Sequence, residues 1–353
     1  MISLLGAALT EDAEICEALR ASLSTLLRHQ TPQGLIPNNV NPAGKPNFRA
    51  YADGGLWWVI GSSILALNAP AISKILDWYA GQDVDRTGLI SIQESCDWQD
   101  LFCTRGKGLY VNCLHAIALR RAASLDSRYA GRTEAAASAI NRYLWYRGDE
   151  DLRPHIAPSF STDNQEADSL GRPRWLPQKR VLPNQRYYVP YVSFRDVGEW
   201  FDTLGNLLAI LAGVADRDQT DAILELIASR KVAQYPARAI YPPVTRGDSD
   251  WREYYGSLNV PNHYHNGGIW PFIGGFYVAA LVKAGLTREA VDALERLAAM
   301  NSGGDFCEWH DGETGAPAGV PKQAWSAGMF LYACECVERG TAPFLCEDAP
   351  KSL

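Results

Sequence analysis

The sequence lacks a long hydrophobic run. Of its 353 residues, 47% are hydrophobic, yet no apolar stretch approaches the ~20 residues that a membrane-spanning helix requires. The first residues, MISLLGAALTEDAE, also lack the basic start and the cleavage site of a signal peptide. These absences predict a cytoplasmic protein that has no membrane partner.

Basic residues are also fewer than acidic residues. The chain carries 33 Lys and Arg against 40 Asp and Glu, a net charge of -7, with no block of like charges. Because phosphate binding needs a basic patch, the composition predicts that nucleic acid is not a partner.

Cysteine pairs with metal or redox spacing are missing. The eight cysteines include no CxxC pair, and several lie in apolar helical segments. We interpret them as buried free thiols, which fits a reducing compartment.

The sequence also shows no convincing alternating strand and no βαβ signature, whereas helical periodicity recurs throughout. Thr10 is the expected N-cap of the first helix, and Asp216 with Gln219 resembles a capping box before another. The expected helices cover 11–28, 113–125, 136–146, 205–215, 220–230, 274–285, 287–300 and 323–340.

The expected helices come in pairs that are joined by two kinds of segment. Some joints are short, such as ADRDQ and KAGLT. Others are long and rich in aromatic, Gly, Pro and acidic residues, and loops of this length are unusual unless they are functional. Their alternation predicts an all-α fold, a single (α/α)6 toroid over residues 1–353, with the long loops on one face. These long segments are 30–55, 81–108, 147–200, 236–268 and 301–322.

The longest interruption, 147–193, is polar, rich in proline and ends in an aromatic cluster formed by Tyr187, Tyr188 and Tyr191. A disordered linker is one interpretation. The aromatic residues favour an ordered flap over a pocket.

Acidic residues in these loops lie beside tryptophan. Asp53, Asp97, Asp100 and Glu308 are examples, and the chain has 11 tryptophans. Any one acid could be a solvated helix cap. Together they indicate sugar binding, because aromatic rings stack on the apolar faces of sugars and carboxylates accept from hydroxyls. A glycosidase needs two such carboxyl groups, and burial against tryptophan raises the pKa of the one that acts as the acid.

The stretch HYHNGGIWPF, residues 263–272, is open to three interpretations. Its HxH pair could chelate a metal, but no third ligand lies at a telling spacing. It could also be a polar turn or one wall of a pocket.

Four blocks resemble successive blocks of the neutral/alkaline invertases, glycoside hydrolase family 100. The blocks are DGGLWWVIG, EWFDTLGNLLAILAGVADRDQTDAILELI, YHNGGIWPF and EWHDGETG followed by KQAWSAG. They also resemble amylo-α-1,6-glucosidase-type debranching enzymes and family 63 α-glucosidases. The resemblance runs from about residue 30 to 340 and implies an (α/α)6 fold and hydrolysis with inversion.

The resemblance also implies roles for individual residues. Asp100, in CDWQDLF, matches the general acid, with Asp97 as its rival, and Glu308, in EWHDG, matches the general base. Asp53 matches a substrate-binding aspartate, and no cofactor is required. The remaining expected substrate-binding residues are Trp57, Trp98, His265, Asn266, Trp270, Trp309, Gln323 and Trp325.

The substrate stays open among small α-glucosides. Sucrose leads only narrowly over α-1,6-linked and glycerate-linked glucosides, because the segment VPKQAWS lacks the extra basic residues of invertases. A sugar epimerase using His263, His265 or His310 and a non-catalytic sugar-binding protein are the alternatives of other classes. A homo-oligomer is also open, since apolar helix faces look the same in a core and in an interface.

Overall fold

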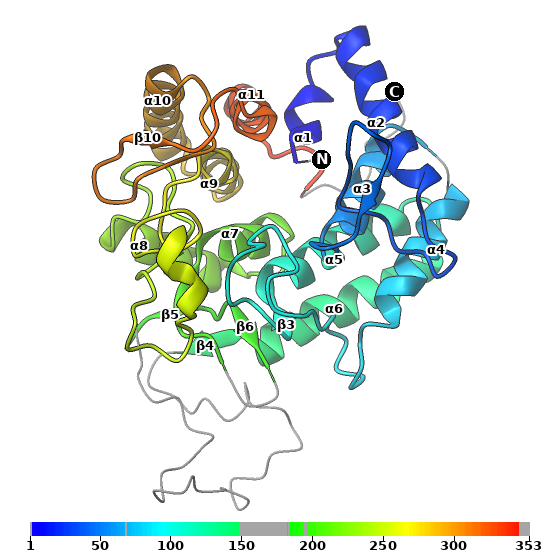
Figure 1. Ribbon diagram of the computed structural model, residues 1–353, viewed down its shortest axis with the longest axis horizontal. Coiled ribbons are helices and arrows are strands. Elements are labelled where there is room, and N and C mark those ends of the chain that lie inside the picture. Colours follow the sequence, from blue (N-terminus) through cyan, green and yellow to red (C-terminus); the bar gives the residue numbers. More distant parts are fainter. Residues whose placement is uncertain (1, 68, 148–181, 183, 194–196, 346–353) are drawn as a thin grey trace, which may run out of the picture.

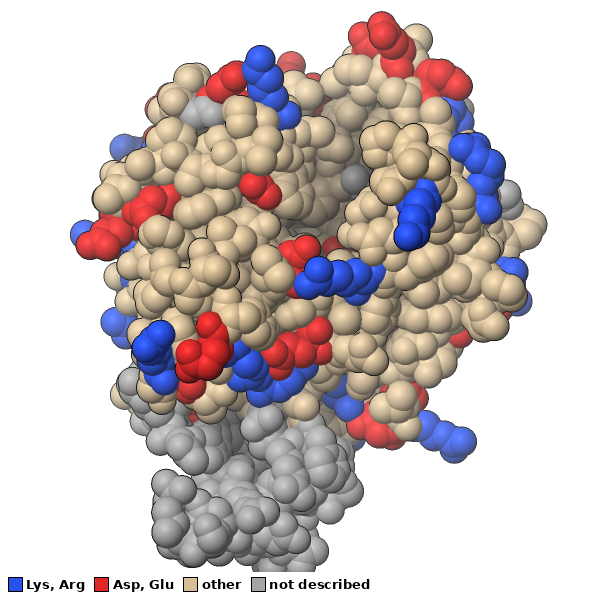
Figure 2. All heavy atoms as spheres, viewed as in Figure 1, with Lys and Arg blue, Asp and Glu red and all other residues tan. Residues whose placement is uncertain are grey.

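The structure, a computed structural model, describes all residues except 1, 68, 148–181, 183, 194–196 and 346–353. Its described part contains eleven α-helices, arranged as an inner and an outer set around a central hollow (Figures 1 and 2). The inner helices are α1 (Leu4–Ala7), α3 (Gly54–Ile64), α5 (Leu109–Ala123), α7 (Thr203–Leu211), α9 (Pro271–Lys283) and α11 (Ala324–Arg339). The outer helices are α2 (Ala13–Arg28), α4 (Ala69–Ala80), α6 (Ala130–Tyr143), α8 (Arg217–Ser229) and α10 (Thr287–Gly304).

Burial distinguishes the two sets. All nine residues of α7 are buried, as are all residues of α9 from Pro271 to Val282, so these helices are surrounded by protein on every side. By contrast, α2 buries only Leu23 and Leu26 and turns its polar face outward. The sequence therefore sorts helices into the two rings through the width of their apolar faces.

The inner helices form a closed ring. Contacts run from α3 to α5, α7, α9, α11 and then α1. Leu4 of α1 faces Gly61 of α3, which completes the circle. This arrangement confirms the predicted (α/α)6 toroid. In such a ring α5 lies opposite α11, and α3 lies opposite α9.

The connections confirm the predicted alternation of short turns and long loops. Between α7 and α8, the Asp216 carboxylate accepts from the Gln219 N–H at 2.8 Å, and the Gln219 side chain accepts from the Asp216 N–H at 2.9 Å. This is the predicted capping box. At the first long helix, however, the N-cap is Asp12 rather than Thr10, because the Asp12 carboxylate accepts from the Ile15 N–H.

Short strands occur where no alternating strand was expected. Each has two or three residues, too few for a period-2 pattern to show in the sequence. They form five antiparallel pairs, β1 with β2, β3 with β6, β4 with β5, β7 with β8 and β9 with β10. The strands are β1 (Asn39–Val40), β2 (Pro46–Asn47), β3 (Lys107–Gly108), β4 (Trp145–Arg147), β5 (Arg186–Tyr188), β6 (Tyr191–Val192), β7 (Phe201–Asp202), β8 (Ile240–Tyr241), β9 (Trp309–His310) and β10 (Pro317–Ala318).

The expected flap at 147–193 lies mostly outside the described residues. Its described end forms β5 and β6, in which Tyr187, Tyr188 and Tyr191 are buried. Among the helices that the structure describes, none has the length and hydropathy to cross a bilayer.

Candidate active site

A pocket of about 320 Å³ opens among the long loops at the centre of the ring. Figure 2 shows the hollow, with charged side chains at one edge. Four of the five long segments contribute to its wall, through Asn38, Asp97, Tyr264 and Glu308 among others, as the loop pattern predicts. The complete lining is Ile2, Asn38, Ala50, Asp53, Gly54, Trp57, Asp97, Trp98, Asp100, Tyr264, Glu308 and Trp325.

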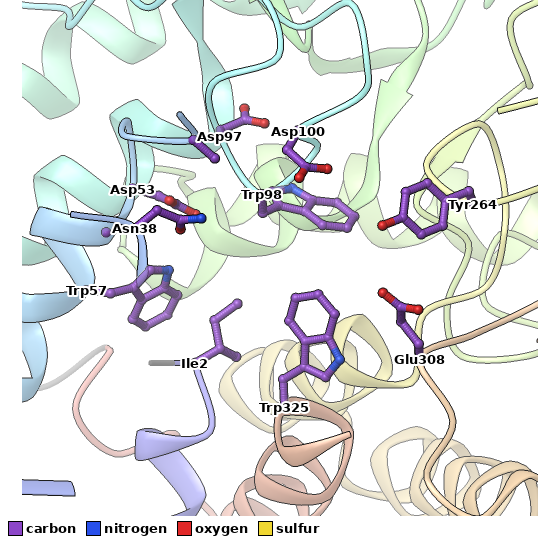
Figure 3. A pocket seen from close by; sticks show the side chains of 12 residues that line it. Ile2, Asn38, Asp53, Trp57, Asp97, Trp98, Asp100, Tyr264, Glu308 and Trp325 are labelled. Atoms are coloured by element: carbon purple, nitrogen blue, oxygen red, sulfur yellow. The ribbon is translucent and has the colours of Figure 1, made fainter. Parts of the chain in front are cut away.

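Asp100 and Glu308 line this pocket from opposite sides of the ring. Asp100 lies in the loop that precedes α5, and Glu308 lies in the loop that precedes α11. Figure 3 shows both carboxyl groups directed into the cavity. Opposed carboxyl groups around one cavity are the arrangement that acid and base catalysis on a single bond requires.

Burial raises the pKa of both carboxyl groups. The Asp100 pKa is raised by burial, against the lowering effects of the Arg49 charge and of a backbone N–H. Burial also raises the Glu308 pKa, the Val320 N–H at 3.3 Å from the carboxylate lowers it, and the negative charge of Asp100 raises it further. The charge of Asp100 thus favours the protonated form of Glu308.

Asp53 lies against α3, on the side of the ring opposite α9. The Tyr110 hydroxyl donates to its carboxylate at 2.9 Å, and the Trp57 indole donates in turn to the Tyr110 oxygen at 2.9 Å. Burial raises the pKa of Asp53 to about 6, although the Tyr110 hydrogen bond lowers it. A fixed carboxyl of this kind can hold a sugar hydroxyl, as donor when protonated and as acceptor when ionised.

Asp97 is more deeply placed than Asp100. It is 1% exposed, and one carboxyl oxygen accepts from the Gln99 N–H at 2.9 Å. Within the described part of the chain, the other oxygen has no partner. Burial raises the Asp97 pKa well above its usual range, and the charge of Asp53 raises it further. Asp97 therefore lines the pocket as a carboxyl group whose protonated form is favoured by burial.

Aromatic side chains form the remaining walls. Trp325 stacks on Phe272 with ring centroids 5.0 Å apart, and Trp98 meets the same Phe272 edge to face at 5.2 Å. These contacts fix both indoles at the cavity, where they can cover the apolar face of a sugar ring.

Tyr264 was not predicted from the sequence, yet its hydroxyl points into the pocket (Figure 3). Burial raises its pKa, and so do the charges of Glu308 and Asp100, which places the hydroxyl within the field of both carboxyl groups. Its backbone has φ 44°, a left-handed conformation that is rare for a bulky residue. Such strain at a pocket is typical of a functional position.

The residues expected beside Tyr264 lie behind the pocket wall. His265 is 1% exposed, stacks on Tyr264 with centroids 4.1 Å apart, and has a pKa lowered to about 3 by burial. The Asn266 amide donates to the carbonyls of Val244 and Asn259 and accepts from the Val244 N–H. Neither side chain is among the residues that line the pocket.

Trp270, Trp309 and Gln323 are also absent from the pocket lining. The Trp270 indole donates to the Tyr264 carbonyl at 3.0 Å and so helps to fix the backbone of that residue. Trp309 meets the Tyr264 ring edge to face at 5.9 Å, and Gln323 is the N-cap of α11. Their roles in the structure are positional.

The HxH pair does not form a metal site with other described residues. His263 pairs with Asp311 at 3.1 Å, while His265 is buried against aromatic rings. No group of three or more His, Cys, Asp or Glu side chains within the described ranges could hold a metal ion. His310 contacts the Cys307 thiol at 3.1 Å, and none of the three histidines lines the pocket.

The family model of alkaline and neutral invertases matches residues 167–339. This chain resembles those enzymes. Cytosolic invertase 1 of Oryza sativa subsp. japonica is 28% identical over 334 residues, covering 80% of this chain and 56% of that protein. Alkaline/neutral invertase E of Arabidopsis thaliana, a chloroplastic protein, is 30% identical, covering 80% of this chain and 51% of that protein. The chain thus spans about half the length of these invertases.

Solved structures show the same fold. A bacterial glucoamylase complexed with acarbose superimposes with a TM-score of 0.65 at 15% identity, covering 97% of this chain and 49% of that one. A family 63 mannosylglycerate hydrolase from Thermus thermophilus, in complex with glucose, gives 0.62 at 13% identity, covering 94% and 91%. At these identities the likeness establishes the toroid alone.

Proposed function

We propose that this protein is an inverting glycoside hydrolase that acts on a small α-glucoside, with sucrose as the leading substrate. The observation that carries the proposal is the pair of carboxyl groups, Asp100 and Glu308, that face one pocket from opposite sides of the ring. The resemblance to invertases supports the substrate class.

In the proposed mechanism the glucosyl ring occupies the pocket, with Asp53 accepting from its hydroxyls and Trp98 and Trp325 covering its apolar surface. Asp100 donates its proton to the glycosidic oxygen as the bond from that oxygen to the anomeric carbon breaks. Glu308 takes a proton from a water molecule whose oxygen attacks the same carbon from the opposite face. An α-glucoside then yields β-glucose, and we expect the two carboxyl groups to be ~6.5–9.5 Å apart around that water.

Asp100 suits the acid role better than its rival, Asp97. Asp100 is half-buried and borders the cavity with its carboxyl directed inward, whereas Asp97 is 1% exposed. A donor must come within hydrogen-bond reach of the leaving oxygen, and the more exposed carboxyl can do so. The raised pKa of Asp100 favours the protonated form that this role needs.

Two alternatives receive less support. An epimerase with a histidine base would require a histidine at the pocket, and none of the histidines that the structure describes is among the lining residues. A binding protein without activity would not need two opposed carboxyl groups with raised pKa values. We propose a cytoplasmic location, supported by the seven free cysteines in the described part of the chain and by the cytosolic relative.

The deciding experiment is proton NMR of the reaction within its first minutes, with sucrose, isomaltose and glucosylglycerate as substrates. We expect early β-glucose, lowered by roughly 100- to 10,000-fold in Asp100→Asn and in Glu308→Gln. Asp97→Asn serves as the comparison and should lose less. Early α-glucose would exclude inversion, and loss in Asp97→Asn alone would move the acid role to that residue. No turnover of any substrate would refute the proposed activity on these glycosides.

A further inference from the structure

A second cavity lies next to the pocket and shares Asp100 with it. This neighbouring cavity has a volume of about 400 Å³. Its lining is Arg49, Glu94, Ser95, Asp100, Leu101, Tyr254, Ser257, Leu258 and Asn259. Among the described residues, Asp100 alone is in the lining of both cavities, so it stands at their junction.

If Asp100 is the general acid, its position at the junction indicates where the two halves of the substrate lie. The proton goes to the oxygen between the sugar that is attacked and the group that leaves. The attacked sugar must also face Glu308, which lines only the first pocket. The group on the other side of the oxygen then extends past Asp100 into the neighbouring cavity.

We propose that this neighbouring cavity is the leaving-group site and that it takes a neutral sugar ring. The inference rests on the proposed function and deepens it, since it assigns the second half of the substrate.

Tyr254 provides the surface on which a sugar ring would stack. It lies in the 3-10 helix η4 (Glu253–Ser257) and its side chain is 47% exposed. Its hydroxyl donates to the Glu94 carboxylate at 3.1 Å, which holds the ring in place. Leu258, 37% exposed, adds apolar surface at the same wall.

Charges of both signs line the cavity. Arg252 donates to the two oxygens of Glu94 at 2.9 and 2.7 Å, and Arg105 lies 3.7 Å from the same carboxylate. Arg252 and Arg105 therefore hold this carboxylate in place and offset its charge. Arg49 supplies N–H donors, and Ser95 and Ser257 supply hydroxyls. A mixture of donors and acceptors beside an aromatic face suits a ring of neutral hydroxyls.

The test compares two substrates that share the glucosyl group. Sucrose has a sugar as its leaving group, whereas α-glucosyl fluoride has an ion that is too small to contact Tyr254 and needs little help from an acid. We expect Tyr254→Ala to lower kcat/KM for sucrose roughly tenfold more than for the fluoride. Tyr254→Phe keeps the aromatic ring and should therefore lower kcat/KM for sucrose less than Tyr254→Ala does. Inhibition by fructose should weaken in Tyr254→Ala, while inhibition by glucose should not.

Matched controls separate this site from general damage. Tyr235 is 42% exposed and lines neither cavity, so Tyr235→Ala should leave both substrates unaffected. Equal losses on the two substrates in Tyr254→Ala would overturn the leaving-group site while leaving the proposed function intact. An inactive wild-type protein on both substrates would instead overturn the proposed function.

A last comparison tests the chemical class of the leaving group. Glucosylglycerate carries a carboxylate in place of the second sugar. The neutral-sugar assignment is wrong, and the cavity takes an anion, if two results are found together. Glucosylglycerate must be a better substrate than sucrose, and Arg49→Gln must lower kcat/KM for it more than Tyr254→Ala does.

Discussion

Helices α1 and α11 meet where Gly6 packs against the backbone of Gly328, and this contact predicts a large response to a single added methyl group. A Cβ on Gly6 of α1 would lie 1.9 Å from the Gly328 carbonyl oxygen of α11 and 2.8 Å from the Tyr332 nitrogen. Ordinary contacts between such atoms are ~3.5 Å, so α1 must move by more than ~1 Å in Gly6→Ala. Both opposing atoms are backbone and cannot rotate away.

The overlap in Gly6→Ala should lower the free energy of unfolding and Tm. Overpacking of a tight core costs ~1–3 kcal/mol. With an unfolding entropy of about 2.1 cal/mol/K per residue over the 353 residues, each 1 kcal/mol lowers Tm by about 1.3 °C. We therefore expect Gly6→Ala to lower Tm by roughly 1–4 °C in calorimetry. Because Ile2, just before α1, lines the pocket, KM for the substrate should rise as well.

Gly131→Ala is the matched control, since a Cβ at this position in α6 meets nothing within 4 Å. Helix propensity alone should stabilise it by ~0.5–1 kcal/mol. If Gly6→Ala proves as stable as Gly131→Ala, then the α1–α11 contact is not tight and the reasoning fails.

Three further predictions concern the site and its surroundings. Tyr264→Phe removes the hydroxyl near both carboxyl groups and should lower kcat by roughly 10-fold or more, as expected for a hydrogen bond to a charged group. The pH dependence of kcat should shift as well, and an unchanged pH profile would show that the hydroxyl does not interact with the carboxyl groups. Asn266→Ala should destabilise the fold by ~2–4 kcal/mol, because three buried backbone groups lose their partner, with KM unchanged in the folded fraction. Burial raises the pKa of Asp202 from 3.8 to about 7, so the folded state holds a proton that the unfolded state has released, and stability should fall as pH rises from about 4 to 7. Denaturant titrations should show that Asp202→Asn removes roughly 2–4 kcal/mol of this loss.

Several tryptophans and acids that the sequence marks near the starts of inner helices line the pocket. Asp53 and Trp57 at α3, Asp100 before α5, and Trp325 at α11 all line it. The ring brings the N-terminal ends of its inner helices to one face, so residues at these positions meet in space although they are far apart in the chain. The alternation of short turns and long loops was enough to predict that convergence.

The HYHNGGIWPF segment shows what the sequence could not predict. Tyr264 turns into the pocket, while His265 and Asn266 turn away. The direction depends on a positive φ at Tyr264 and another at Gly267, 44° and 90°, and nothing in the residue types indicates which neighbour takes the left-handed conformation. The Tyr264 carbonyl accepts from both the Gly268 N–H and the Trp270 indole, and these hydrogen bonds stabilise the left-handed conformation of Tyr264. Such contacts form only once the loop is folded.

The placement of the proposed acid and the proposed base follows from the architecture rather than from local sequence. Asp100 precedes α5 and Glu308 precedes α11, and these helices are three positions apart in a ring of six. The distance between the two carboxyl groups is therefore set by the width of the ring. Opposed helices leave space for a water molecule between base and sugar, which is the geometric requirement for inversion.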